Sequence, residues 1–355
     1  MNVVFRTDAS NVIGSGHVMR CLTLADALCS EGAAGVEFVC RDFPGHLANV
    51  IEQRGYPVRL LPPPDGPADS WLGVSQQRDA AETTQSLAMT PDWLIVDHYA
   101  IDSQWESLLR PHCRRLMVID DLADRPHDCD VLLDHNWLPD MAQRYQAMVP
   151  SAACCLLGPE YLLLPESIWQ AAAKAVPRDG QVRRLLLFMG GADPLNLTAV
   201  ALDALRGFVR RDWQIDVVVG QSNPQWQRIA DMCAADEWCR FHCQTPSMLQ
   251  LICQADLAIG AGGVSAWERC MLGLPTLAVC AADNQRAGLQ MLAAHDCVEL
   301  LGEAEDVSAE RIAVRLQWLL DHPERLVQLS GNGIAALAGA RPVSGPRKVA
   351  GVLLG

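Results

Sequence analysis

The chain alternates short, continuously apolar segments with amphipathic segments, and this alternation restricts the possible fold more than any other feature. Residues 93–97, 116–119 and 257–260 are examples of the apolar segments, and short connections lead from them into helical patterns. Strands without polar alternation are typical of parallel sheets that helices cover on both faces. The sequence therefore predicts an α/β fold built from doubly wound parallel sheets.

The length of the chain and one break in its pattern indicate two domains. The chain has 355 residues and is 50% hydrophobic, which is enough for two cores of ordinary size. Pro177 and Gly180 interrupt the alternation of strands and helices between the two halves. We therefore expect an N-terminal domain over residues 1–165, a crossing segment over 166–183 and a C-terminal domain over 184–355.

The charge and the terminal pattern exclude several classes of partner. A formal net charge of −14 argues against a nucleic acid or an anionic membrane surface. A small anionic ligand stays compatible with it, because a few N–H groups and arginines can outweigh the overall field locally. No apolar segment approaches the roughly 20 residues of a membrane-spanning helix. The N-terminus has the pattern of a strand rather than of a signal peptide.

The 14 cysteines include no Cys-x-x-Cys pair and are scattered through apolar segments. In a chain of this length we expect them to be small buried residues of a reduced, cytoplasmic protein. Cys239, His242 and Cys243 are close in sequence, but no second ligand cluster accompanies them. We therefore expect no metal site there.

A strand, a polar loop and a helix follow one another at the N-terminus. The loop contains Gly14, Ser15 and Gly16, and His17 stands where the helix begins. Backbone N–H groups of such a loop can bind an anion. The positive end of the helix disfavours the imidazolium form, and a neutral imidazole can take a proton. His17 is therefore a candidate catalytic base, although a lone histidine is often structural. Arg20, one turn on, could meet an anion or the acids at the strand ends.

A second glycine-rich segment follows the apolar strand 257–259 and opens a helix. Gly262 and Gly263 would let the backbone approach a ligand closely. Ser265 and Glu268 lie one helical turn apart, so both could face that ligand, with Glu268 accepting hydrogen bonds from a ribose diol. The alternative is a capping box made by the same two residues. The glycines before Ser265 favour the ligand.

Two weaker signals lie elsewhere in the second half. Gly190 and Gly191 follow another apolar strand, and they indicate either a plain strand-to-helix turn or a surface that faces the ligand. Asn196 is the expected N-cap of the helix after them. Asn284 and Gln285 open a later helix, where they could contact a ligand or cap the helix.

The combination of motifs resembles a known family over nearly the whole chain. It is similar to the UDP-2,4-diacetamido-2,4,6-trideoxy-β-L-altropyranose hydrolases of pseudaminic acid biosynthesis, a GT-B-like family of nucleotide-sugar hydrolases. The segments that carry the resemblance are residues 8–10, 13–17, 20–22, 96–99, 119–125, 133–136, 158–161, 189–198, 260–275 and 284–285. Two departures are modest: Asn136 stands where the family often has glutamine, and no arginine precedes Pro165 and Glu166.

The resemblance implies a fold and a reaction. The fold would be GT-B-like, with two Rossmann-like domains facing an interdomain cleft. It would resemble that of the peptidoglycan N-acetylglucosaminyltransferase, with water in place of the sugar acceptor. His17 would be the general base that activates water to attack C1 with inversion and release UDP. No cofactor or obligatory metal is implied. We expect a monomer with a UDP-sugar substrate in surface-glycan biosynthesis. A glycosyltransferase and a non-catalytic nucleotide-sugar binding protein stay as alternatives.

The resemblance also assigns binding residues to both halves. The residues implied for the sugar side are Asp8, Gly14, Ser15, Gly16, Arg20, Gly190, Gly191, Asn284 and Gln285. The residues implied for UDP are Gly262, Gly263, Val264, Ser265 and Glu268. Breaking the bond from C1 to oxygen builds negative charge on the β-phosphate, so preorganised donors are needed there. The helix N-termini near Gly16 and Ser265 could supply them.

Overall fold

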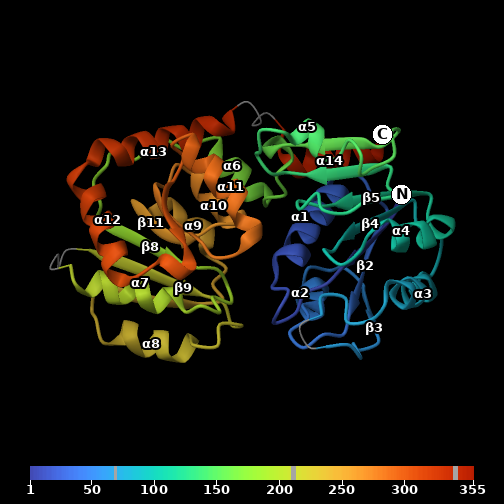
Figure 1. The fold of residues 1–355 in the computed structure, drawn as a ribbon, viewed down its shortest axis with the longest axis horizontal. Helices are drawn as coiled ribbons and strands as arrows, with labels where there is room; N and C mark the ends of the chain where they lie inside the picture. The colour runs from blue at the N-terminus through green and yellow to red at the C-terminus, as the bar shows by residue number, and fades with distance from the viewer. Residues whose placement is uncertain (68–69, 209–212, 339–342) are drawn as a thin grey trace. The chain divides into compact units, whose positions relative to one another are not determined.

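The computed structural model describes residues 1–67, 70–208, 213–338 and 343–355. The chain divides into two compact units, and each is a parallel sheet covered by helices (Figure 1). Unit 1 comprises Met1–Pro165 and Pro342–Gly355, and unit 2 comprises Glu166–Arg341. The expectation of two doubly wound α/β domains is confirmed.

Unit 1 contains a seven-stranded parallel sheet in the order β3-β2-β1-β4-β5-β6-β7. The strands are β1 (Asn2–Thr7), β2 (Gly35–Arg41), β3 (Val58–Leu61), β4 (Trp93–Asp97), β5 (Arg115–Ile119), β6 (Val131–Asp134) and β7 (Cys154–Leu157). The helices are α1 (Gly16–Ser30), α2 (Ala48–Gln53), α3 (Gln76–Ser86), α4 (Ser103–Leu109), α5 (Met141–Arg144) and α14 (Gly345–Leu354), with short 3-10 helices at Arg110–His112 and Pro159–Tyr161.

The two faces of this sheet explain why its strands are apolar throughout. Val3 and Phe5 of β1 pack into the core that α1 and α14 cover. Val4, between them, packs into the core on the other face, together with Ala80 of α3 and Trp105 of α4. Successive side chains of a strand point to opposite faces, so a strand with helices on both sides needs apolar residues at every position.

The C-terminal helix α14 corrects the expected domain boundaries. Residues 184–355 were expected to form one domain, but α14 belongs to unit 1. Val349 and Leu353 are buried in the core beneath α1. The indole Nε1 of Trp93 donates a hydrogen bond to the Leu353 carbonyl, 2.9 Å away. The apolar stripe of α14 therefore completes the core of unit 1.

The expected crossing segment, residues 166–183, also belongs to unit 2. Its first part forms helix α6 (Glu166–Ala172). Further on, the Arg178 guanidinium donates hydrogen bonds to the carbonyls of Ile252, Ala255 and Leu272, at 3.0 to 3.2 Å. These bonds attach the segment to the body of unit 2.

Unit 2 contains a six-stranded parallel sheet in the order β10-β9-β8-β11-β12-β13. The strands are β8 (Arg184–Phe188), β9 (Gln214–Val219), β10 (Cys239–Cys243), β11 (Leu257–Ala261), β12 (Thr276–Cys280) and β13 (Glu299–Glu303). The helices besides α6 are α7 (Leu197–Arg206), α8 (Trp226–Ala234), α9 (Met248–Gln254), α10 (Val264–Met271), α11 (Asp283–Ala294), α12 (Ala309–Asp321) and α13 (Pro323–Ala336), with a 3-10 helix at Ala304–Asp306.

Each sheet has one point at which the strand order reverses, and the sequence motifs lie there. In unit 1 the chain leaves β1 toward β2, whereas β4 pairs with the other side of β1. In unit 2 the chain leaves β8 toward β9, whereas β11 pairs with the other side of β8. Open α/β sheets bind ligands at the carboxyl ends of the strands at such a switch point. The loops after β1, β4, β8 and β11 are therefore where a site is expected.

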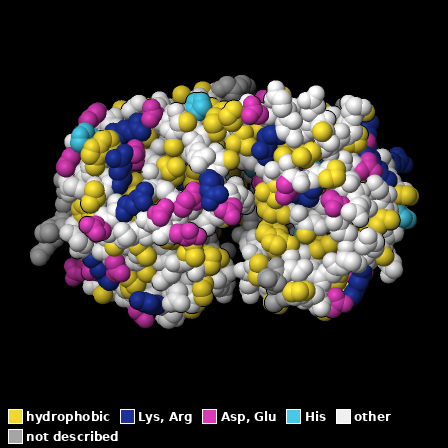
Figure 2. Space-filling view, viewed as in Figure 1, with side chains coloured by type: hydrophobic (Ala, Val, Ile, Leu, Met, Phe, Trp, Pro, Cys, Tyr) yellow, Lys and Arg dark blue, Asp and Glu magenta, His cyan; other side chains and the backbone are white. Residues whose placement is uncertain are grey.

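The surface agrees with the acidic composition. Acidic and basic side chains are interspersed over the face shown in Figure 2, without one broad basic patch. Within the described ranges, no helix combines the length and the apolarity that crossing a membrane requires.

Candidate active site

His17 is held by a carboxylate from the neighbouring strand of the sheet. Thr7, at the end of β1, pairs in register with Asp97, at the end of β4. The imidazole Nδ1 lies 2.6 Å from Asp97 Oδ1, and both side chains are buried. Because Asp97 already accepts from an arginine, it is an ionised acceptor and Nδ1 carries the proton toward it. The other ring nitrogen, Nε2, then has the free lone pair of a base.

Arg20 orients Asp97 and connects it to a second acid. Its Nε and one terminal nitrogen each lie 2.6 Å from an oxygen of Asp97. The other terminal nitrogen lies 3.0 Å from Asp121. Burial alone would raise the pKa of Asp97, but the charge of Arg20 and the hydrogen bonds from Arg20 and His17 outweigh it and hold that pKa well below its usual range. Of the two partners expected for Arg20, the strand-end acids are present, and contact with a substrate anion stays a prediction.

Two aromatic rings surround the His17 imidazole. Tyr99, just past β4, meets it edge to face with ring centroids 4.6 Å apart. Trp71, from the loop before α3, meets it edge to face at 5.8 Å and lies 5.0 Å from the Tyr99 ring. The Tyr99 side chain also hydrogen-bonds Asp121. These rings restrict the rotation of the imidazole and shield its bond to Asp97 from water.

His135, just past β6, is a second histidine in this cluster. It is buried, and burial together with the charge of Arg20 lowers its pKa to about 4. Its Nδ1 and the Oδ1 atom of Asp121 are buried and have no hydrogen-bond partner among the residues that the structure describes. The carboxyl end of the sheet therefore holds a neutral imidazole and a carboxylate oxygen that are available for a polar ligand group.

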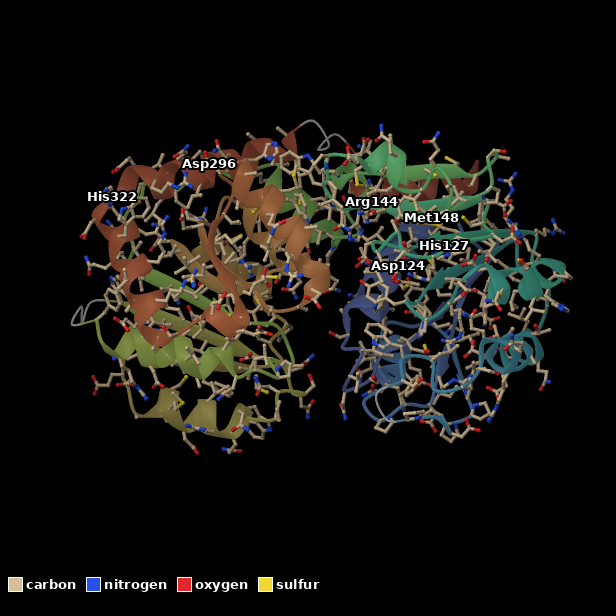
Figure 3. All side chains as sticks on the ribbon, viewed as in Figure 1. Asp124, His127, Arg144, Met148, Asp296 and His322 are labelled. Atoms are coloured by element: carbon tan, nitrogen blue, oxygen red, sulfur yellow. The ribbon has the colours of Figure 1, made fainter. Side chains whose placement is uncertain are left out.

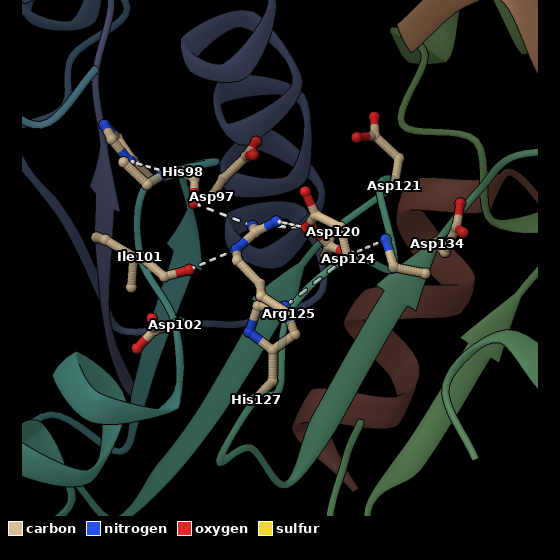
Figure 4. A network of polar contacts seen from close by, with 12 residues as sticks. Asp97, His98, Ile101, Asp102, Asp120, Asp121, Asp124, Arg125, His127 and Asp134 are labelled. Atoms are coloured by element: carbon tan, nitrogen blue, oxygen red, sulfur yellow. Dashed lines mark hydrogen bonds and ion pairs between the residues drawn. The ribbon is translucent and has the colours of Figure 1, made fainter. Parts of the chain in front are cut away.

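Arg125 ties together the loops that carry these groups, as Figure 4 shows. Its guanidinium donates to the carbonyls of Ile101 and His98, at 2.7 and 3.3 Å, and pairs with Asp120 at 2.8 Å. Arg144 of α5 (Figure 3) donates to the Asp121 carbonyl at 3.0 Å. The loops after β4 and β5 are therefore fixed by charged hydrogen bonds, although they lack regular structure.

Asp8 does not occupy the position expected of a substrate contact. Its side chain is fully buried, and one oxygen lies 2.7 Å from Arg6 and 2.6 Å from the backbone N–H of Arg41. Its other oxygen lies 3.3 Å from His98 Nε2. Burial opposes the charged form, but Arg6 and His98 keep the pKa of Asp8 below its usual range. Asp8 thus anchors the start of the loop, and its assignment to direct sugar binding is corrected.

The glycine loop leaves its backbone accessible beside His17. Gly14 has a φ of +79° and donates to the Ser10 carbonyl at 2.9 Å, which closes a tight turn. A Cβ atom on Gly14 or Gly16 would meet nothing within 4 Å. Ser15 is exposed, and its side chain makes no capping bond to α1. The three residues are free to contact a ligand, and that role stays a prediction.

In unit 2, the capping box expected as the alternative for Ser265 and Glu268 does not form. The N-cap of α10 is Gly263, with a φ of +78°, and Ser265 already lies inside the first turn. The Ser265 hydroxyl accepts a hydrogen bond from Arg269 at 3.2 Å. Without a side-chain cap, the first N–H groups of α10, from Val264 onward, are available to an anion.

Glu268 has the properties that a ribose-binding carboxylate requires. Its side chain is partly buried, and its carboxylate forms no hydrogen bond or ion pair with any residue that the structure describes. Burial raises the pKa of Glu268 to about 7, although the charge of Arg269 opposes the shift. A desolvated acceptor without a protein partner suits the hydroxyl donors of a ligand.

Gln285 lies against the same glycine loop. Its Oε1 accepts a hydrogen bond from the Ala281 N–H at 3.2 Å and would lie 2.9 Å from a Cβ atom on Gly262. The structure thus brings Gln285 together with the residues expected to bind UDP, whereas Asn284 is exposed at the first turn of α11. Gly262 is also required for packing, because a Cβ there would lie 2.6 Å from Leu289.

The loop after β8 lies beside β11 at the switch point of unit 2. Gly190 has a φ of +94°, and the Gly191 carbonyl accepts from the Gly220 N–H at 2.9 Å. Asn196 was the expected cap of α7, but it makes no side-chain capping bond. Asp193 accepts from the N–H groups of Leu197 and Thr198, each at 2.9 Å. The Asp193 carboxylate therefore caps α7 in place of the expected Asn196 side chain.

No group of three or more metal-ligating side chains is found among the residues that the structure describes. His242 of β10 pairs with Asp216 of β9 at 2.8 Å.

Sequence reasoning gave no role to several residues of the His17 cluster. Asp97 and Tyr99 entered only as part of a matching motif, and Trp71 and His135 received no functional role. One available signal was the acid at or directly after the end of three buried strands: Asp97 ends β4, Asp134 ends β6, and Asp120 follows β5. Once β4 is placed beside β1, the Asp97 carboxylate comes next to the start of α1.

Comparison with solved structures defines the class of fold. The spinosyn rhamnosyltransferase SpnG, complexed with spinosyn aglycone, matches with a TM-score of 0.64 and 16% identity over 100% of both chains. MurG of Acinetobacter baumannii matches with a TM-score of 0.62 and 14% identity over 99% of both chains. The chain has the GT-B-like fold of two Rossmann-like domains.

Sequence comparison with curated proteins finds three relatives of this chain. It is 25% identical to the UDP-2,4-diacetamido-2,4,6-trideoxy-β-L-altropyranose hydrolase of Campylobacter jejuni, over 82% of this chain and 96% of that protein. The resemblance to this hydrolase that the sequence motifs predict is confirmed. An uncharacterised protein of Methanocaldococcus jannaschii is 23% identical over 81% of this chain, which spans 57% of that longer protein. The Bacillus subtilis spore coat polysaccharide biosynthesis protein SpsG is 29% identical over 48% of this chain and 50% of its own length. No protein-family model matches the chain.

Proposed function

We propose that this protein hydrolyses a UDP-linked 2,4-diacetamido-2,4,6-trideoxy sugar, with the β-L-altropyranose as the expected substrate. The observation that carries the proposal is the buried pair of His17 and Asp97 at the switch point of unit 1. The homologous hydrolase of Campylobacter jejuni supports the substrate class. UDP and the free sugar are the products.

In the proposed reaction His17 Nε2 takes a proton from water as the water oxygen forms a bond to C1. The bond between C1 and the UDP oxygen breaks, and its electron pair leaves with the β-phosphate. Attack opposite the leaving group inverts C1, and the proton on His17 later returns to solvent. Asp97 accepts from Nδ1 at 2.6 Å and stabilises the positive charge that the imidazole acquires. A positioned base contributes about 10²–10⁴-fold to the rate.

We further propose that unit 2 binds the nucleotide. The N–H groups of Gly263 and of the start of α10 would hold the diphosphate. The Gly262 N–H donates to the Val279 carbonyl at 3.0 Å, so Gly262 would serve by letting the backbone approach the ligand closely. Glu268 would accept hydrogen bonds from the ribose diol. Negative charge grows on the β-phosphate as the bond to C1 breaks, so donors fixed in place before the reaction favour the transition state. Gly14, Ser15, Gly16, Gly190, Gly191 and Asn284 are proposed for the sugar side, with Gln285 supporting the glycine loop.

The test is an assay of UDP release by the purified protein without any acceptor. Wild-type protein is expected to release UDP and free sugar from the UDP-diacetamido sugar. His17→Asn is expected to bind UDP with unchanged affinity and to lose turnover by at least about 100-fold. Met19→Ala, at a position of α1 that is 39% exposed, serves as the control for disturbance of the helix that carries His17. Absence of UDP release from the wild type would contradict hydrolysis.

Glycosyl transfer is the second candidate, because the structural matches include transferases. It predicts UDP release only when an acceptor is added. A non-catalytic binding protein predicts binding of the UDP-sugar without turnover under both conditions. The same assay with and without acceptor, combined with calorimetric binding, separates the three functions.

A further inference from the structure

A buried arginine lies beneath the glycine loop of unit 2. Arg269 is 1% exposed. Its guanidinium donates to the Ala261 carbonyl at 2.6 Å, to the Ser265 hydroxyl at 3.2 Å and to the Thr276 hydroxyl at 3.3 Å. All three acceptors are neutral, so each guanidinium nitrogen donates one hydrogen bond while the charge is not neutralised.

No carboxylate within the described part of the chain forms an ion pair with Arg269. Glu268, its neighbour in sequence, interacts with its charge but makes no hydrogen bond to it. Burial lowers the pKa of Arg269 to about 10, which still leaves the guanidinium charged at neutral pH. Buried charges in proteins are usually paired, because their desolvation is unfavourable. An unpaired buried cation therefore needs an explanation.

The position of the charge relative to the loop supplies that explanation. Two of the acceptors, Ala261 and Ser265, stand immediately before and immediately after the segment Gly262, Gly263 and Val264. A Cβ atom on Gly260 would lie 2.9 Å from a terminal nitrogen of Arg269, so glycine is required for the guanidinium to fit there. The charge thus lies directly behind the loop and the uncapped start of α10.

We propose that Arg269 is a positioning residue that supports the diphosphate of the nucleotide from behind this loop. The inference deepens the proposed function and depends on UDP being the ligand. Arg269 holds the Ala261 carbonyl and the Ser265 side chain in place, which sets the direction of the Gly263 and Val264 N–H groups between them. Its charge, poorly screened because it is buried, adds to the positive potential at the start of α10. That potential favours the negative charge that grows on the departing diphosphate.

A purely structural role for Arg269 makes a different prediction. If the hydrogen bonds only hold the loop, their loss weakens every ligand of the loop alike, whether or not the ligand is charged. If the charge acts on the diphosphate, its loss weakens UDP and leaves uridine almost unaffected. Comparing uridine with UDP therefore separates the two roles.

The experiment measures calorimetric affinities of the full-length protein for uridine and UDP at pH 8, where the Glu268 carboxylate is mostly ionised. It also measures kcat and KM for the UDP-sugar at that pH. Arg269→Gln removes the charge and keeps an N–H donor. It is expected to weaken UDP at least tenfold, to change uridine less than twofold, and to lower kcat. Arg269→Lys keeps the charge and is expected to restore UDP affinity to within threefold of wild type. Thr276→Val removes one neutral partner and is the control, with less than twofold change for both ligands.

The outcomes separate this inference from the proposed function. The role of the charge is overturned if Arg269→Gln weakens uridine and UDP binding equally, or if it leaves UDP affinity unchanged. Neither result contradicts the proposal that the wild-type protein binds UDP. If Arg269→Gln does not fold, Arg269→Lys provides the test, because it keeps the charge. Tenfold weaker UDP binding by Arg269→Lys, with unchanged uridine binding, contradicts the inference. If wild-type protein does not bind UDP, the proposed function fails, and this inference fails with it.

Discussion

At the scale of single residues, the central feature is that His17 does not act alone. The sequence argument placed it at the positive end of a helix, which by itself disfavours a charged imidazole. The structure adds Asp97 at 2.6 Å, whose carboxylate favours the charge once the proton has been taken. Arg20 and the Tyr99 ring then fix the geometry of the pair. The proposed base is therefore a histidine–aspartate pair.

This pairing predicts that Asp97→Asn acts through His17. The variant is expected to lower kcat by roughly 10²-fold or more, because the imidazole loses its orientation and its stabilising charge. The double variant His17→Asn/Asp97→Asn should be no slower than His17→Asn alone. The measurement is a double-mutant cycle on kcat, with UDP affinity as the check that unit 2 is intact. Losses that multiply in the double variant would contradict a shared role.

The raised pKa of Glu268 predicts how nucleoside binding depends on pH. The ionised carboxylate is the better acceptor for two ribose hydroxyls, and burial raises its pKa to about 7. Lowering the pH below 7 protonates it, so uridine affinity should fall roughly tenfold between pH 8 and pH 6. Calorimetry with uridine avoids the titration of phosphate. Glu268→Gln is the control and should show weak binding without this pH dependence, whereas a flat profile in the wild type would reject the role of Glu268.

At the scale of elements, the sequence motifs lie at turns whose backbone geometry restricts the residues they can hold. Strand ends and glycine loops were predictable, because apolar runs and glycines mark them directly. The residue that caps α7 was not predictable. Asp193 and Asn196 both precede the helix and both are good capping residues, and only the structure shows that Asp193 accepts from the helix N–H groups. Asp8 was misassigned for a similar reason, because its partners Arg6 and His98 become visible only in the folded sheet.

The loop before α1 offers a matched pair of substitutions. Gly14 has a φ of +79°, which an L-residue adopts only with strain. The φ of Gly16 does not lie in this positive range, so a side chain there causes no such strain. Neither site would place a Cβ within 4 Å of another group. Gly14→Ala should lower the free energy of unfolding of unit 1 by about 1–2 kcal/mol, and Gly16→Ala should change it by less than about 0.5 kcal/mol. Denaturant titrations measure both, and equal effects would contradict the backbone argument.

At the scale of the whole molecule, the class of fold was predictable and one domain boundary was not. Continuous apolar strands and their helices define two parallel sheets, and both are present. The last helix was assigned to the second domain because it follows that domain in sequence. Its buried residues Val349 and Leu353 belong to the core of unit 1, and the helix pattern alone does not reveal which sheet an apolar stripe covers.

Helix α14 gives a test of this domain assignment. Leu353→Ala removes a side chain that is 3% exposed and should destabilise unit 1 by about 2–5 kcal/mol. Leu354→Ala, at a position that is 36% exposed, is the matched control and should have little effect. Hydrogen exchange should show faster exchange in β1 and β4 and unchanged exchange in β8 and β11. Faster exchange confined to unit 2 would contradict the assignment.

Hydrolysis at C1 by water is the central claim, and oxygen-18 tests it most directly. The protein is incubated with the UDP-diacetamido sugar in water enriched in oxygen-18, and both products are analysed by mass spectrometry early in the reaction. Attack at C1 predicts oxygen-18 in the free sugar and none in UDP. Oxygen-18 in UDP would show cleavage between phosphorus and oxygen instead, and would contradict the proposed role of His17 as the base at C1.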